Sequence, residues 1–144
     1  GEIDIDHFKS VNDRFGHLHG DEVLVVLSRI LHNSFRKTDL IYRFGGEEFV
    51  VIVYVDDRND AEMTFERLRR SIENHVFPQV GRVTVSIGIT EIRDTSIPVE
   101  LLGRADQALY YAKTHGRNQV SFYEALVARH EILPSPDAQT SSDA

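Results

Sequence analysis

The chain has 144 residues, and its 41% hydrophobic and 27% charged residues are ordinary for one globular domain with its own core. It contains no cysteine, which excludes disulfide bonds and thiolate metal sites. The net charge of −7 argues against binding along a nucleic-acid backbone, which requires clustered Lys and Arg side chains.

The first part of the chain predicts a strand followed by two helices. Ile and acidic residues alternate over residues 2–6, which predicts a strand with one apolar face. Apolar residues at helical spacing predict a short helix over 7–15, ended by Gly16. We expect a loop over 16–20 and a longer helix that starts at Asp21, because an acid suits a helix N-terminus. The apolar stripe of that helix consists of Leu24, Leu27, Leu31 and Phe35.

The middle of the chain predicts a hairpin, a helix and a strand. Two apolar segments, 40–42 and 49–55, are joined through Gly45-Gly46 and predict a β-hairpin. An amphipathic pattern predicts a helix over 61–74, and a β-branched run predicts a strand over 83–89.

The last part predicts one more helix and strand. The helix is expected from Pro98, which suits a first helical turn, to Gly116, and the strand over 119–122. The tail after about residue 132 has almost nothing to bury, and we expect it to be disordered. The order β-α-α-β-β-α-β-α-β predicts an α+β fold class, with a ferredoxin-like βαββαβ core and a sheet flanked by helices.

Three acidic side chains are expected to meet if the hairpin pairs with the first strand: Asp4, Glu47 and Glu48. Oxygen ligands without His or Cys suit Mg²⁺, which binds a few carboxylates together with substrate phosphates. Gly45-Gly46 leaves the turn without side chains, so a nucleotide can lie against its backbone. The alternative is a surface hairpin with solvated acids, and the acids taken alone favour it, since charged turn residues are mostly exposed.

Four separated blocks change that balance, because in this order they resemble the signatures of the GGDEF family, the diguanylate cyclases. They are Asp4-Ile5-Asp6-His7-Phe8-Lys9 with Asn12-Asp13, Phe15-Gly16-His17 and Gly20-Asp21; Arg43-Phe44-Gly45-Gly46-Glu47-Glu48-Phe49; Ser86-Ile87-Gly88-Ile89; and Ala105-Asp106-Gln107-Ala108-Leu109-Tyr110 with Ala112-Lys113 and Gly116-Arg117-Asn118. The resemblance runs from Asp4 to about Phe122 and implies a palm core with a nucleotidyl-cyclase-like sheet. It places the domain at 1–124 and a C-terminal extension at 125–144.

The resemblance implies that the domain condenses two GTP molecules into cyclic di-GMP and releases two pyrophosphates. Two copies of the domain would face each other, and the 3′-hydroxyl of each GTP would attack the α-phosphate of the other. The implied cofactor is Mg²⁺, with Mn²⁺ as a substitute, at two ions per active site. The implied partners are GTP, cyclic di-GMP as product and inhibitor, a second copy of the domain and an upstream sensor domain, with no nucleic acid and no membrane contact.

The same resemblance assigns the catalytic roles. Asp4 and Glu47 are implied metal ligands, assisted by the Ile5 carbonyl. Glu48 is implied either as a further ligand or as the base that takes the 3′-hydroxyl proton.

The implied substrate-binding residues are Phe8, Lys9, Asn12, Asp21, Gly45, Gly46, Lys113 and Arg117. Asn12 and Asp21 match positions that hold guanine, and a carboxylate suits the N1–H and 2-amino donors of that base. Lys9, Lys113 and Arg117 match cations that hold the β- and γ-phosphates. The residues alone leave alternatives open: Asp21 as a helix N-cap, and the cations as solvent-facing charges near a helix end.

Arg36-Lys37-Thr38-Asp39 lies five residues before Gly45, as Arg-x-x-Asp does in family members with an inhibitory product site. Arg67 matches a further arm of that site. The alternative for Arg36 and Asp39 is an ordinary i,i+3 ion pair on a helix end.

Family members have more chain before Asp4, with an Asp-x-Leu-Thr-x-Leu-x-Asn-Arg pattern, so we expect a fragment that lacks an N-terminal segment. No apolar run approaches the ~20 residues that cross a bilayer, and we expect a cytoplasmic location, alone or as part of a larger, membrane-bound receptor. The alternative function is a catalytically silent module that binds GTP or cyclic di-GMP.

Overall fold

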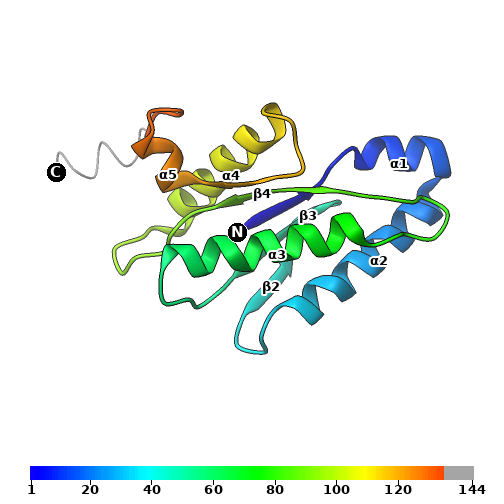
Figure 1. The fold of residues 1–144 in the computed structure, drawn as a ribbon, viewed down its shortest axis with the longest axis horizontal. Coiled ribbons are helices and arrows are strands. Elements are labelled where there is room, and N and C mark those ends of the chain that lie inside the picture. Colours follow the sequence, from blue (N-terminus) through cyan, green and yellow to red (C-terminus); the bar gives the residue numbers. More distant parts are fainter. Residues whose placement is uncertain (135–144) are drawn as a thin grey trace.

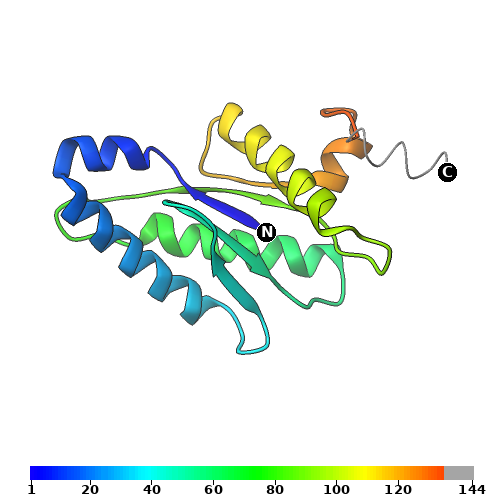
Figure 2. The same ribbon diagram turned by 180° about the vertical axis from the view of Figure 1, so that it is seen from behind.

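A five-stranded sheet in the order β2-β3-β1-β4-β5 forms the centre of the computed structural model, which describes residues 1–134. Along the chain the elements are β1 (Glu2–Ile5), α1 (Phe8–Phe15), α2 (His17–Ser34), β2 (Leu40–Arg43), β3 (Glu48–Ile52), α3 (Arg58–Asn74), β4 (Val85–Ile89), α4 (Pro98–Thr114), β5 (Val120–Phe122) and α5 (Tyr123–Ala128). Helices α3 and α4 lie on opposite faces of the sheet, as Figures 1 and 2 show from the two sides, and α2 packs beside α3. The predicted α+β class with a helix-flanked sheet is confirmed.

Strand β1 lies in the middle of the sheet and pairs antiparallel with both β3 and β4. Since side chains alternate along a strand, its Ile residues and its acids face opposite sides. Ile3 and Ile5 are buried in the main core with the apolar stripes of α2 and α3. Glu2 and Asp4 are therefore directed to the face that α4 covers. The sequence pattern that looked half-solvated is in fact buried on both faces.

Helix α4 packs directly on β4 at Gly88. A Cβ at that position would overlap the Ala105 carbonyl oxygen and the backbone of Leu109. Both obstacles are backbone atoms of α4, so a larger residue could be accommodated only by moving the helix. This close approach holds the middle of α4 against the sheet.

Gly88→Ala is accordingly expected to lower the free energy of unfolding by about 2 kcal/mol, the usual scale of overpacking in a core. Urea unfolding should show a lower midpoint with an unchanged slope. The control is Gly103→Ala on helix α4, where a Cβ meets no atom within 4 Å. There the better helix propensity of Ala should raise stability by about 1 kcal/mol. A Gly88→Ala protein as stable as the control would contradict the packing argument.

Some element limits differ from those that the sequence predicts. The predicted loop over 16–20 is wrong, because only Gly16, at φ 90°, interrupts the helices and α2 begins at the next residue. Helix α3 starts earlier than expected, because the Asp57 carboxylate caps it by accepting from the Asp60 N–H at 2.9 Å. Strands β3 and β4 are shorter than expected, and the ends of the predicted runs lie outside the ladder.

Helix α5 was not predicted, and it spans the expected boundary at residue 124. Its Tyr123 and Leu126 are buried against Ala108 of α4. The disorder expected after about 132 falls mainly on residues 135–144, which lie outside the described residues. Within residues 1–134, no helix is both long enough and apolar enough to cross a membrane.

Candidate active site at the β2–β3 hairpin

Asp4 and Glu48 lie directly opposite each other in the antiparallel pair of β1 and β3. Directly opposed residues share a face of the sheet, so their carboxylates are neighbours. Asp4 is only 4% exposed, and Glu48 is half-buried. Glu47 precedes β3, and its carbonyl accepts from the Ile5 N–H at 3.3 Å. The structure thus places the carboxylates of Asp4 and Glu48 side by side, and it places Glu47 beside them through its backbone bond to Ile5.

Lys113, in the last turn of α4, forms an ion pair with the Asp4 carboxylate. Burial alone would lower the pKa of Lys113, but the hydrogen bond to Asp4 and the charges of Asp4 and Glu48 raise it overall. Desolvation and the nearby charge of Asp4 raise the pKa of Glu48, against the opposing effect of Lys113. One ammonium therefore does not neutralise this group of acids.

Two further acids that the sequence did not single out complete the cluster. Glu2 is 5% exposed on the same face of β1 as Asp4, and it contacts Asp106 of α4. Burial, followed by the charges of Asp106 and Glu48, raises the pKa of Glu2 to about 7. The signal was present in the alternation of acids along residues 2–6. What could not be seen was that α4 covers this face.

The acidic cluster has the donor chemistry that suits a hard divalent cation, provided that other ligands complete the shell of the ion. Within the described part of the chain, no three acidic or imidazole side chains are gathered closely enough to hold a metal ion by themselves. Mg²⁺ does not require such a cage, because it takes one or two carboxylates and completes its shell with water and substrate phosphates. Asp4 and Glu48, excess negative charge and the absence of nitrogen or sulfur donors match that preference.

Arg43 organises the hairpin turn. Its Nε donates to the Gly45 carbonyl at 3.2 Å and its Nη2 to the Gly46 carbonyl at 2.8 Å. Around Gly46 a Cβ would meet nothing within 4 Å, and around Gly45 the nearest atom, at 3.8 Å, belongs to Glu48. The two glycines therefore have free space around them, while the Arg43 side chain holds the backbone of the turn. Sequence analysis gave Arg43 no role, although its position beside two glycines was a signal.

Asn12 lies against Gly20, one residue before Asp21. A Cβ on Gly20 would overlap the Asn12 side-chain oxygen and would lie 3.4 Å from the Phe8 ring. Asp21 itself is exposed on the second turn of α2, so the expected start of the helix at this residue is wrong, and so is the N-cap alternative. Asp21 and Arg43 line a cavity of about 560 Å³ between α2 and the hairpin.

The predicted phosphate-binding cations lie on two different elements, α1 and the C-terminal end of α4 with the loop beyond it. Lys113 and Arg117 follow each other at the C-terminal end of α4, and Arg117 is exposed in the loop beyond it. Lys9 is exposed on α1. The ion pair with Asp4 places Lys113 in the cluster, and the structure shows no contact that joins Lys9 to it.

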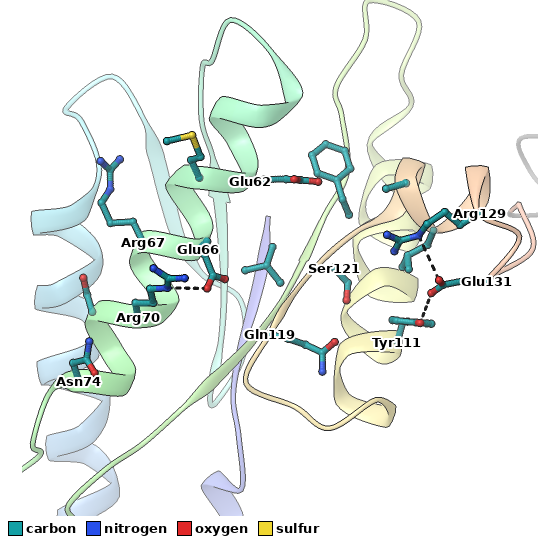
Figure 3. A pocket seen from close by; sticks show the side chains of 16 residues that line it. Glu62, Glu66, Arg67, Arg70, Asn74, Tyr111, Gln119, Ser121, Arg129 and Glu131 are labelled. Carbon is teal, nitrogen blue, oxygen red and sulfur yellow. Dashed lines mark hydrogen bonds and ion pairs between the residues drawn. The ribbon is translucent and has the colours of Figure 1, made fainter.

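The residues predicted to form an inhibitory site lie on different elements. Arg36 and Asp39 form a tight turn after α2, in which the Asp39 carboxylate accepts from the Arg36 backbone N–H at 2.8 Å. Their guanidinium and carboxylate form no ion pair within residues 1–134, so the alternative of an ordinary ion pair on a helix end is wrong. Arg67 lies on α3, where it lines a cavity of about 980 Å³ between α3, β5 and α5 (Figure 3). None of the acids at the hairpin lines that cavity.

Comparisons with known proteins find relatives of this chain. A family model described as diguanylate cyclase, GGDEF domain, matches residues 2–119. Diguanylate cyclase DgcM of Escherichia coli is 43% identical over 118 residues, which cover 82% of this chain and 29% of DgcM. Diguanylate cyclase DgcP of Pseudomonas aeruginosa is 43% identical over 121 residues, covering 82% of this chain and 18% of DgcP. The chain thus spans less than a third of the length of these relatives.

Solved structures show the same fold. The GGDEF domain of DgcB from Caulobacter crescentus, in complex with c-di-GMP, superposes with a TM-score of 0.80 at 32% identity, covering 85% of this chain and 75% of that one. The active GGEEF domain of a diguanylate cyclase from Vibrio cholerae gives a TM-score of 0.77 at 34% identity, covering 85% and 80%. The fold, the acidic hairpin and these matches agree, and the chain belongs to the GGDEF family of diguanylate cyclase domains.

Proposed function

We propose that this domain condenses two GTP molecules into cyclic di-GMP, one GTP on each of two facing copies. The observation that carries the proposal is the pairing of Asp4 with Glu48 across β1 and β3, beside an open glycine turn and with Lys113 as counter-ion. Relatives that are named diguanylate cyclases support the reaction. Since the chain spans only part of those relatives, an upstream sensor domain is part of the same proposal.

The residues around the cluster suit a phosphoryl-transfer site, in which catalysis is mainly positioning and charge neutralisation. Asp4, the Ile5 carbonyl and Glu47 would hold Mg²⁺ or Mn²⁺, two ions per active site, and the metal would neutralise the triphosphate and polarise the attacked α-phosphate. Lys113 then exchanges its bond to Asp4 for the β- and γ-phosphates, where Arg117 and Lys9 join it. Asn12 and Asp21 hold the guanine, with Phe8 packed behind them.

Glu48 is the residue best suited to take the proton of the 3′-hydroxyl. Burial and the charge of Asp4 raise its pKa, and a base is most effective when its pKa approaches the working pH. The hydroxyl that it deprotonates belongs to the GTP of the facing copy, so each site is complete only in a pair of domains. A pair is accordingly the proposed active form.

Incubation of the domain with GTP and Mg²⁺ at high protein concentration, or fused to a dimerising partner, tests the proposal by chromatography of the products. We expect cyclic di-GMP and pyrophosphate, and a loss of at least about a hundredfold in Glu48→Gln, as for removal of a general base. GTP that is bound but remains intact under both conditions would refute the cyclase and support a binding module.

We further propose that cyclic di-GMP inhibits the domain at Arg36, Asp39 and Arg67. The support is the exposed turn at 36–39, where the Arg36 guanidinium has no ion pair with any residue of 1–134 and can bind a guanine edge or a phosphate. In the same assay, Arg36→Ala should abolish inhibition by added product without changing the initial rate. Inhibition that persists in this variant would contradict the site.

A further inference from the structure

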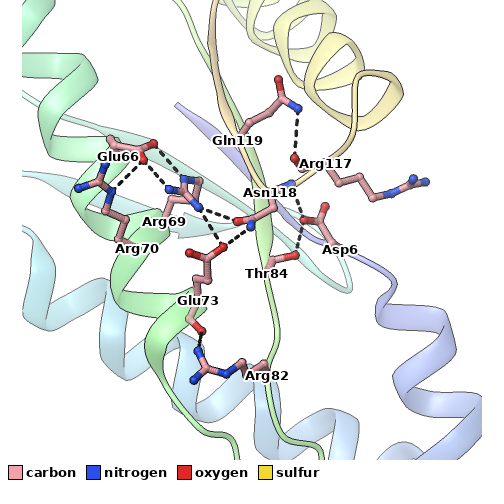
Figure 4. Close-up of polar contacts among 10 residues, drawn as sticks. All are labelled: Asp6, Glu66, Arg69, Arg70, Glu73, Arg82, Thr84, Arg117, Asn118 and Gln119. Atoms are coloured by element: carbon pink, nitrogen blue, oxygen red, sulfur yellow. Dashed lines mark hydrogen bonds and ion pairs between the residues drawn. The ribbon is translucent and has the colours of Figure 1, made fainter.

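A buried carboxylate that the proposed chemistry does not use holds the loop after α4. Asp6 follows β1 and is 6% exposed. It accepts from the Ser86 hydroxyl at 2.6 Å. It also accepts from the Thr84 hydroxyl at 2.7 Å and from the Asn118 backbone N–H at 3.0 Å (Figure 4). A buried carboxylate with three donors has its hydrogen bonds satisfied. Through these bonds Asp6 connects the segment after β1 to the loop between α4 and β5.

The loop that it ties is conformationally strained. Arg117 and Asn118 both lie in the left-handed region, at φ 60° and 46°, although neither is a glycine. Such backbone is unfavourable for residues with a side chain, and it persists only where surrounding contacts impose it. Gln119 supplies two of these contacts, because its side-chain amide donates to the Arg117 carbonyl at 3.1 Å and to the His115 carbonyl at 2.6 Å.

The Asn118 side chain anchors the loop to α3 from the other side. Its oxygen accepts from Arg69 Nη1 at 2.8 Å, and its amide nitrogen donates to Glu73. Arg69 has a side chain only 12% exposed and is itself held by Glu66 through its Nε at 2.9 Å. Asn118 is thus fixed through both its backbone and its side chain by elements far apart in the sequence.

The Arg117 side chain, by contrast, is unengaged. Within the described residues its guanidinium has no hydrogen bond or ion pair, and Figure 4 shows it extending away from the network. Its backbone N–H donates to the Ala112 carbonyl at 2.9 Å, which fixes it relative to the end of α4 and so to Lys113. A constrained backbone that carries an unpaired cation is the arrangement expected of a group held ready for an anion.

We infer that Asp6 and Asn118 are positioning residues for Arg117, which they hold beside Lys113 for the terminal phosphates of the substrate. This inference rests on the proposed function for the identity of the substrate. A cation whose backbone is already ordered loses less freedom on binding, and small displacements of such groups are costly. The contacts of Asn118 with Arg69 and Glu73 therefore contribute to triphosphate binding although they touch no substrate.

A double-mutant cycle in binding tests the inference. The variants are Asn118→Gly, which keeps left-handed backbone accessible but removes both side-chain contacts, Arg117→Ala, and the two combined. Calorimetry uses GMP and a GTP analogue with a methylene bridge between the α- and β-phosphates, which cannot be turned over. We expect Asn118→Gly to weaken the analogue about tenfold, to leave GMP unchanged, and to add nothing to Arg117→Ala.

Additive losses in the double variant, or equal weakening of GMP, would show a merely structural role and overturn the inference, as would unchanged binding of the analogue. If Asn118→Gly does not fold, Thr84→Val replaces it, because that substitution removes one donor to Asp6. It is combined with Arg117→Ala, and binding of the analogue and of GMP is measured in the same way. The proposed function is judged separately. A wild-type domain that binds the analogue but makes no cyclic di-GMP would refute the cyclase, while the cycle would still decide the role of Asn118.

Discussion

Lys113→Met is expected to destabilise the domain by about 3 kcal/mol, whereas Asp4→Asn leaves its stability unchanged or higher, although both lower the proposed cyclase activity. The asymmetry follows from burial. The Asp4 side chain is 6% exposed and the Lys113 side chain 33%. Without Lys113, Asp4 remains buried beside Glu48 with no counter-ion. Without the Asp4 charge, Lys113 can still turn toward water, and the crowding of like charges is relieved.

Activity should fall on the order of a thousandfold in either variant, as for loss of a group that stabilises transition-state charge. Chemical denaturation measures the stability of each single variant and of the Asp4→Asn/Lys113→Met double variant. The double variant should recover most of the stability that Lys113→Met loses, because the unpaired charge is gone. Equal destabilisation by the two single substitutions would mean that the ion pair, and not the charge excess, dominates this site.

The acidic hairpin could be predicted from the sequence because its determinants are local. Two glycines between apolar runs predict a hairpin, and acids at its second arm follow from the sequence alone. The pairing of Asp4 with Glu48 needed only one further step, that the hairpin adjoin β1. The same holds for the stripe of α3, whose period of 3.6 residues is visible without any tertiary information.

The elements that sequence analysis missed depend on contacts between distant segments. Gly20 looks like a loop residue in the sequence, but it lies inside α2, where a Cβ would overlap the Asn12 side chain of α1. The hydrogen bond from Asn118 to Asp6 joins residues 112 positions apart, and the sequence around neither residue predicts it. The burial of Glu2 could not be predicted for the same reason, since it depends on α4 covering that face of β1.

The burial of Glu2 leads to the last prediction, which concerns pH. The pKa of Glu2 is raised from 4.5 to about 7 in the folded domain. Between these two values the unfolded chain has lost the proton while the folded domain still holds it, so the unfolded state binds fewer protons. Stability must then fall as the pH rises from about 4.5 to 7 and level off above, by an amount on the order of 3 kcal/mol at most. Glu2→Gln removes this dependence, because the amide carries no charge at any pH.

Glu2→Gln should therefore unfold at a higher urea concentration than the wild type at pH 8, with the difference vanishing near pH 4.5. Unfolding curves at four or five pH values measure it. The matched control is Glu62→Gln, an exposed acid on α3 that should leave the pH profile unchanged.

The contact between Glu2 and Asp106 allows a second test, because the titrations of the two acids are coupled. Asp106→Asn should lower the pKa of Glu2 by removing a neighbouring charge, and so shift the fall in stability to lower pH. A wild-type profile that is flat between pH 5 and 8 would mean that Glu2 is charged in the folded domain, and that the cluster beside Asp4 holds one more negative charge than its burial indicates.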